Sequence, residues 1–153
     1  MKAMTILRRC RNAEQDMRRI QQCIQRRRDA AESITARPDG VGGRSTGEAD
    51  KLSAFVASIT ELEAQLRQRE MALRAEVAAA CVLLDCLPDT ESAVLHQYYI
   101  RRLKLSAIAR RMGYTEGYIR KVRIAGERML EALSCEQVRG ALPGWYLRER
   151  DER

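Results

Sequence analysis

Two long stretches of the chain carry apolar residues at alternating three- and four-residue intervals. In residues 1–35 these positions are Ile6, Cys10, Ala13, Met17, Ile20 and Ile24, continued by Ala31 and Ile34. In residues 49–86 and the leucine that follows they are Leu52, Phe55, Val56, Ile59, Leu62, Leu66, Leu73, Val77, Ala80, Leu84 and Leu87. A heptad spacing places one narrow apolar stripe along a helix. Both stretches are therefore predicted to be long, coiled-coil-like helices.

Residues 36–48 separate these two predicted helices. They contain Pro38 and several glycines, a combination that breaks a helix and marks a loop. A loop of this length between two heptad helices favours an antiparallel hairpin. The pattern leaves open whether the hairpin closes on itself or forms a bundle with another copy. We expect a homodimer or higher oligomer through this hairpin.

The two predicted helices differ in charge, with a net +5 over residues 1–35 and −2 over residues 49–86. In an antiparallel pair, arginines of the first helix are therefore expected to face glutamates of the second. The arginines are Arg18, Arg19 and Arg26–Arg28, and the glutamates are Glu61, Glu63 and Glu70. A second interpretation, in which the arginines form an additional phosphate-binding face, stays open.

Residues 87–133 show a different pattern, with three shorter helical blocks in place of one stripe. The first block has Val94, Leu95, Tyr98 and Tyr99 on one face. The second has Leu105, Ile108, Ala109 and Met112, and the third has Ile119, Val122, Gly126, Met129 and Leu133. Spacings of three and four residues are typical of helices packed on one side. The chain is therefore predicted to be all-α, a long helical hairpin followed by a trihelical domain.

The junction between the second and third blocks has the punctuation of a sharp turn. Gly113 follows the second block directly, where a glycine supplies the positive φ that ends a helix. Thr115 then precedes the third block as an N-cap. A helix, a short glycine-containing turn and a capped helix together predict a helix-turn-helix over residues 87–133.

The charge distribution indicates what this predicted domain contacts. The chain has 28 Lys and Arg residues against 21 Asp and Glu, a net charge of +7, and nine of the basic residues lie in residues 87–133. A helix-turn-helix places the start of its last helix in the major groove of double-stranded DNA. The residues expected to read bases there are Glu116, Gly117, Tyr118, Arg120, Lys121 and Ile124. The residues expected to contact phosphates are Arg101, Arg102, Lys104, Arg110, Arg111, Thr115 and Arg123.

The remaining chemistry-bearing residues form no recognisable site. The five cysteines include no C-x-x-C pair, and the chain has a single histidine, so no catalytic residue, metal site or cofactor is expected. We therefore expect a protein that is not an enzyme. No apolar run is long enough to span a membrane, and the first residues lack the apolar region of a secretion signal. The expected location is the cytoplasm of a bacterial host cell.

The segment from Leu87 to Leu133 resembles region 4 of sigma-70-class factors. The matching residues are Leu87-Pro88, Glu91, Val94-Leu95, Tyr99, Leu103, Leu105, Ile108-Ala109, Met112-Gly113, Thr115, Ile119, Val122 and Leu130. The resemblance implies a helix-turn-helix that binds promoter DNA, with RNA polymerase as a further partner. A helical hairpin followed by such a domain is also similar to the small phage and prophage regulators of late genes, the ArpU/RinA-like group. That similarity implies a sequence-specific transcriptional regulator.

The start of the third block departs from the sigma-factor pattern. Glu116, Gly117 and Lys121 stand where the family has Arg, Glu and Gln, so we expect an operator other than the minus-35 element. Two other functions stay open. One is a DNA-packaging recognition subunit similar to small terminases, and the other is a polymerase-binding module without DNA specificity of its own.

Residues 134–153 form a predicted C-terminal tail. It contains the only tryptophan, Trp145, followed by Tyr146. We expect this aromatic pair to fold back onto the preceding domain. A partner-binding aromatic peptide is the alternative.

Overall fold

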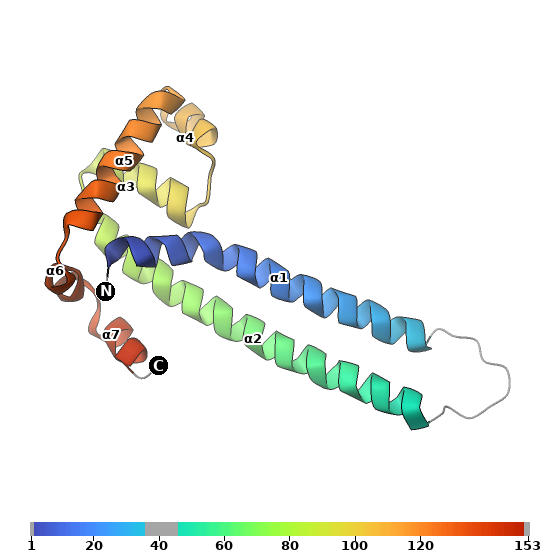
Figure 1. The fold of residues 1–153 in the computed structure, drawn as a ribbon. Coiled ribbons are helices and arrows are strands. Elements are labelled where there is room, and N and C mark those ends of the chain that lie inside the picture. The colour runs from blue at the N-terminus through green and yellow to red at the C-terminus, as the bar shows by residue number, and fades with distance from the viewer. Residues whose placement is uncertain (1, 36–45, 152–153) are drawn as a thin grey trace. The chain divides into compact units, whose positions relative to one another are not determined.

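The computed structural model describes residues 2–35 and 46–151, and within these ranges the secondary structure is helical without strands (Figure 1). The helices are α1 (Ala3–Thr35), α2 (Thr46–Leu84), α3 (Asp89–Leu95), the π-helical turn η1 (His96–Ile100), α4 (Leu105–Met112), α5 (Glu116–Ala132), α6 (Cys135–Ala141) and α7 (Gly144–Asp151). The all-α prediction is confirmed. Most of the predicted loop lies outside the described residues, and α2 begins three residues before the predicted position 49. None of the described helices combines the length and apolar character needed to cross a membrane.

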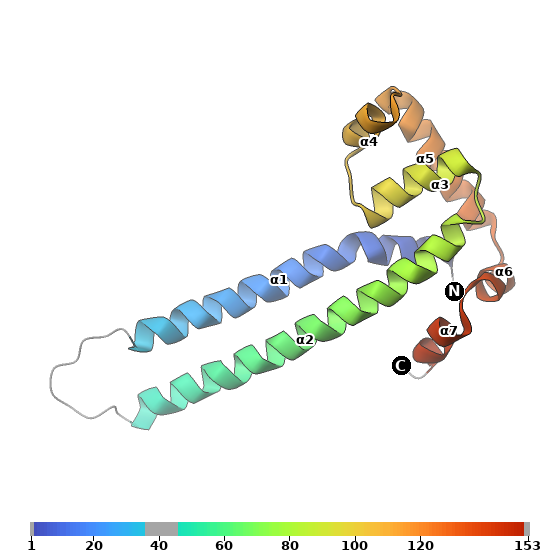
Figure 2. The ribbon, with the colours of Figure 1, turned by 180° about the vertical axis from the view of Figure 1, so that it is seen from behind.

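The chain divides into two compact units. Residues 14–71 form the hairpin unit, and residues 1–13 together with 72–153 form the head unit. Both long helices pass from one unit into the other, so each unit contains an antiparallel portion of α1 and α2 (Figures 1 and 2). The predicted boundaries at 86/87 and 133/134 both fall inside the head unit.

The hairpin unit holds its two helices together with a thin apolar seam. Ile24 is buried, whereas the neighbouring seam residues Ile20 and Ile59 are only partly buried. Val56, which was predicted to lie in the seam, is 56% exposed. Two helices alone enclose little volume, so most seam side chains keep one side in solvent.

One of the predicted ion pairs joins the two helices of the hairpin unit. The Arg28 guanidinium donates to Glu63 Oε1 at 2.6 Å. By contrast, Arg18 pairs with Glu14 at 2.8 Å along its own helix. An acceptor four residues away is reached without crossing the seam, so it competes with acceptors on the facing helix.

The head unit has a main core to which both ends of the chain contribute. The buried side chains of this core include Ile6 and Leu7 from the start of α1, Leu83 and Leu84 from the end of α2, Leu95, Leu130 and Val138. The first turns of α1 are therefore part of the same hydrophobic core as the last turns of α2 and the C-terminal half of α5.

A second, smaller core lies inside the helix-turn-helix. It consists of the buried residues Val94, Ile108, Ala109, Ile119 and Val122. These residues come from α3, α4 and α5, so the predicted trihelical packing is confirmed.

The buried face of α5 continues from the small core into the main core. After Gly126 it continues with Leu130, which is buried. Met129, predicted to face inward, is 42% exposed, so this part of the prediction is wrong. Met129 and Leu130 lie three and four residues after Gly126, one on each side of a full helical turn of 3.6 residues. Of the two, Leu130 is the one that points into the main core.

The tail packs against the head unit through its tyrosine. A capping box in which Ser134 and Gln137 bond each other's backbone N–H groups starts α6. Tyr146 in α7 is buried, and its hydroxyl donates to Glu76 Oε2 at 2.6 Å. The tail was predicted to fold back onto residues 87–133. Tyr146 instead bonds to α2 and lies in the main core, which residues 87–133 share through Leu95 and Leu130, whereas Trp145 lies on the surface.

Candidate nucleic-acid interface

The turn between α4 and α5 is built as the sequence indicates. Gly113 has φ +74° and ends α4 in the left-handed region, where a side chain is strained. The Tyr114 N–H donates to the Ala109 carbonyl at 3.0 Å. Thr115 then caps α5, because its hydroxyl oxygen accepts from the Tyr118 N–H at 3.2 Å. The turn therefore fixes where the first residues of α5 begin.

α5 is also held tightly against α3. A Cβ added at Gly126 lies 2.9 Å from Leu95 Cδ1 and 3.2 Å from Glu91 Cβ. Only a residue without a side chain allows the two helices to approach this closely. The glycine therefore sets the spacing between α5 and α3.

Two tyrosines of η1 connect α5 to the rest of the head unit. The Tyr99 hydroxyl donates to Glu127 Oε1 at 2.8 Å, and the same oxygen lies 3.2 Å from Arg123 Nε. Burial raises the pKa of Tyr99, and the hydrogen bond that its hydroxyl donates to Glu127 raises this pKa further. The hydroxyl therefore stays a proton donor at neutral pH.

Tyr98 lies between two guanidinium groups. Its ring centroid is 3.9 Å from Arg11 Cζ and 4.8 Å from Arg123 Cζ, and Arg11 also donates to the Tyr98 carbonyl. Cations at these distances interact favourably with an aromatic face. The start of α1 and the middle of α5 are thus joined through one aromatic ring.

Most of the predicted base-reading residues lie on the exposed surface at the start of α5. The exposed members are Glu116, Gly117, Tyr118, Arg120 and Lys121, whereas Ile124 is partly buried. A Cβ at Gly117 meets no atom within 4 Å, so the surface there is open. Arg120 Nη2 pairs with Glu116 Oε1 at 3.1 Å, so these two side chains face each other one turn apart.

The predicted phosphate-binding residues fall into two groups. The exposed group consists of Arg101, Lys104, Arg110, Arg111 and Thr115. Arg102 is partly buried and adopts φ +58°, which turns the chain from η1 toward α4. The Arg123 side chain is only 22% exposed and lies against Tyr98 and Glu127. The structure therefore gives Arg123 an internal contact that the sequence pattern does not indicate.

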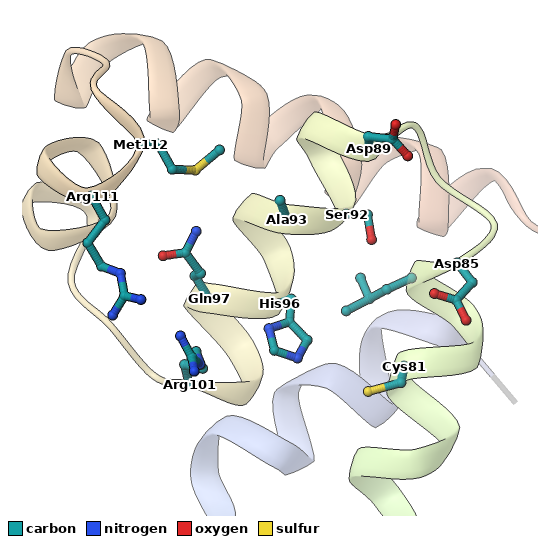
Figure 3. Close-up of a pocket in the computed structure, with 11 residues that line it drawn as sticks. Cys81, Asp85, Asp89, Ser92, Ala93, His96, Gln97, Arg101, Arg111 and Met112 are labelled. Carbon is teal, nitrogen blue, oxygen red and sulfur yellow. The ribbon is translucent and has the colours of Figure 1, made fainter.

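Two of the exposed arginines line a cavity of about 640 Å³ between the end of α2, α3–η1 and α4. Figure 3 shows Arg101, Arg111 and Gln97 toward one end of this cavity and Asp85 and Asp89 toward the other. Met112 and Leu84 add apolar surface. The cavity thus combines both signs of charge with apolar walls, unlike the basic surface expected of a phosphate site.

Tyr114 is an exposed residue of the turn that was not predicted to be a site residue. Its ring centroid lies 4.7 Å from that of Tyr118. Its position between the turn glycine, Gly113, and the helix cap, Thr115, could have indicated this exposure, because a side chain in a tight turn does not lie on the packed face of a helix.

Comparison with known proteins agrees with this geometry. Residues 83–123 match the family described as Sigma-70, region 4. The match begins in the last turn of α2 and ends within α5, so it contains the turn and the exposed start of α5. The helix-turn-helix is region 4-like. A search of curated proteins and a search of solved structures each returned no match.

Proposed function

We propose that this protein is a sequence-specific regulator of transcription that binds double-stranded DNA and has no enzymatic activity. The observation that carries the proposal is the capped, exposed start of α5 within the region 4-like segment. A recognition helix presents such a surface to base edges in the major groove. Lys121 and Arg120 are suited to the O6 and N7 acceptors of guanine, and the exposed Arg110 of α4 is suited to phosphates.

The order of the two parts supports a finer proposal. A long helical hairpin precedes the helix-turn-helix, and this arrangement is similar to that of phage and prophage late-gene regulators of the ArpU/RinA-like group. We assign the protein to this kind of regulator, acting in the bacterial cytoplasm. Glu116 and Gly117 at the start of α5 favour an operator that differs from the minus-35 element.

The test compares two variants that remove one positive charge each. Lys121→Ala alters the start of α5, whereas Arg148→Ala alters α7, which lies at the other end of the head unit (Figures 1 and 2). Fluorescence anisotropy measures binding to a duplex selected from random-sequence DNA and to unselected duplex. Lys121→Ala is expected to weaken binding to the selected duplex by about 1–3 kcal/mol, with a smaller loss on unselected duplex. Equal losses for both variants and both duplexes would contradict a base-reading role for Lys121.

Homodimerisation through the hairpin unit is part of the proposal. Among the described residues of this unit only Ile24 is a buried apolar side chain, and Val56 and Met71 are 56% and 71% exposed. A second hairpin packed over these exposed side chains would remove such surface from water.

Sedimentation of Met71→Glu tests the homodimer, with Ala54→Glu as the control that adds the same charge at another exposed position of α2. We expect the wild-type protein and the control variant to sediment as dimers and Met71→Glu to sediment as a monomer. A monomeric wild-type protein contradicts the homodimer, and a large ring favours the packaging subunit.

A polymerase-binding module is the second candidate. The cavity lined by Arg101, Arg111, Asp85 and Met112 favours it, because mixed charge and apolar walls are suited to a protein segment. This candidate predicts that the protein has no measurable affinity for any duplex at low salt. Retained affinity that falls steeply with salt supports DNA binding instead.

A further inference from the structure

Two exposed tyrosines form a paired surface at the turn of the helix-turn-helix. Tyr114 is 49% exposed and Tyr118 is 43% exposed, and their rings are tilted by 41° with centroids 4.7 Å apart. Both backbone positions are fixed, one by the bond to the Ala109 carbonyl and the other by the Thr115 cap. The two rings therefore start from fixed backbone positions and contact each other on the surface.

The other tyrosines of the head unit show that exposure is not the general state of these side chains. Tyr99 and Tyr146 are buried, and the hydroxyl of each donates to a carboxylate, Glu127 or Glu76. Tyr114 and Tyr118 instead have each other as their ring contact. Tyrosine rings combine an apolar face with a polar hydroxyl group, which is why exposed tyrosines are enriched at interfaces.

The charges beside the pair indicate which partner fits. Lys121 follows Tyr118 on α5, and Arg110 precedes the turn on α4, and both are exposed. Arg120 is exposed as well and pairs with Glu116 at 3.1 Å. Aromatic surface bordered by cations complements a polyanion that also offers apolar groups. The major groove of DNA meets both conditions, because thymine presents its 5-methyl group there.

We propose that the Tyr114–Tyr118 pair contacts thymine methyl groups in the major groove and so makes thymine a determinant of the bound sequence. This inference rests on the proposed function and adds a specificity element to it. A phosphate contact needs only a hydroxyl group, whereas methyl recognition needs ring surface. Substituting phenylalanine for tyrosine removes the hydroxyl group and keeps the ring, so it would abolish a phosphate contact and preserve methyl recognition.

The test uses the full-length protein and a duplex selected from random-sequence DNA. The same duplex is also made with deoxyuridine in place of thymidine, which removes only the methyl groups. Burial of one methyl or methylene contributes about 0.8 kcal/mol, so the wild-type protein is expected to bind the uridine duplex about fourfold more weakly per contacted methyl.

Four variants assign the effect to the rings. Tyr114→Ala and Tyr118→Ala are each expected to reduce the difference between the two duplexes, whereas the double variant Tyr114→Phe/Tyr118→Phe retains it. Trp145→Ala is the control, because it removes an aromatic ring of similar exposure, 42%, from α7. Thermal unfolding by circular dichroism verifies that each variant is folded.

Three results overturn the inference. If the wild-type protein binds both duplexes equally while Lys121→Ala still weakens binding, methyl recognition is wrong and the proposed function stands. If Tyr114→Ala and Tyr118→Ala both leave the difference between the two duplexes unchanged, other residues contact the methyl groups and the inference is wrong. If no duplex is bound at low salt, the proposed function fails and the inference fails with it.

Discussion

Substituting alanine at two glycines of α5 is predicted to change stability in opposite directions. At Gly126 the added methyl lies 2.9 Å from Leu95 Cδ1 and 3.2 Å from Glu91 Cβ, and Leu95 is fully buried. At Gly117 the methyl meets nothing within 4 Å. The same chemical change in one helix therefore separates helix propensity from packing.

The magnitudes follow from these contacts. Overpacking a buried site lowers the free energy of unfolding by about 1–3 kcal/mol. Replacing a helical glycine by alanine raises it by up to about 1 kcal/mol. The net effect expected for Gly126→Ala is a loss of about 1 kcal/mol. Gly117→Ala has only the favourable contribution, about 0.5 kcal/mol in the first turn of the helix. The two variants are expected to differ by about 1.5 kcal/mol.

Urea unfolding of the full chain measures this difference. Trp145 is the only tryptophan and adjoins the buried Tyr146, so its fluorescence reports on the main core of the head unit. With a urea dependence of about 2 kcal/mol per molar, the two midpoints should lie roughly 0.7 M apart, with Gly126→Ala the lower. The reasoning about the close approach of α3 and α5 is wrong if Gly126→Ala is as stable as Gly117→Ala.

Three further predictions concern named contacts of the head unit. Tyr99→Phe leaves Glu127 without the hydroxyl donor at 2.8 Å and should lower the free energy of unfolding by about 1–2 kcal/mol in urea titrations; an unchanged midpoint contradicts it. Glu116→Gln removes the carboxylate that pairs with Arg120 at 3.1 Å, so DNA affinity in anisotropy titrations should rise, most at low salt; a decrease at all salt concentrations would show that Glu116 itself accepts a hydrogen bond from a base. Burial raises the pKa of the Cys10 thiol from 9.0 to about 12, so the folded state keeps a proton that the unfolded chain releases, and stability should fall as pH rises above about 9. The loss between pH 9 and pH 10 should be smaller in Cys10→Ala, and equal slopes for the two proteins would exclude this cause.

Local signals in the sequence were sufficient to predict the turn of the helix-turn-helix. Gly113 and Thr115 act within a few residues of their own position, one through its φ and the other through a cap bond. Their structural roles follow from residue chemistry alone. For the same reason the fold class and the exposed start of α5 were predictable.

Tertiary packing decided the features that the sequence left undetermined. A heptad stripe shows which side chains of α1 are apolar and does not show what covers them. Ile6 and Leu7 enter the core of the head unit, whereas Ile20 belongs to the hairpin unit. The contacts of Arg123 with Tyr98 and Glu127 likewise depend on η1 and α5 meeting in space.

The central claim is that the exposed start of α5 reads DNA sequence. The most direct test is the ratio of affinities for a duplex selected from random-sequence DNA and for an unselected duplex, measured at physiological salt with the full-length protein. Specific regulators typically bind their site at least about 10³-fold more tightly than other DNA, and we predict a ratio of that order. A ratio near one, with affinity set by salt alone, would contradict the account.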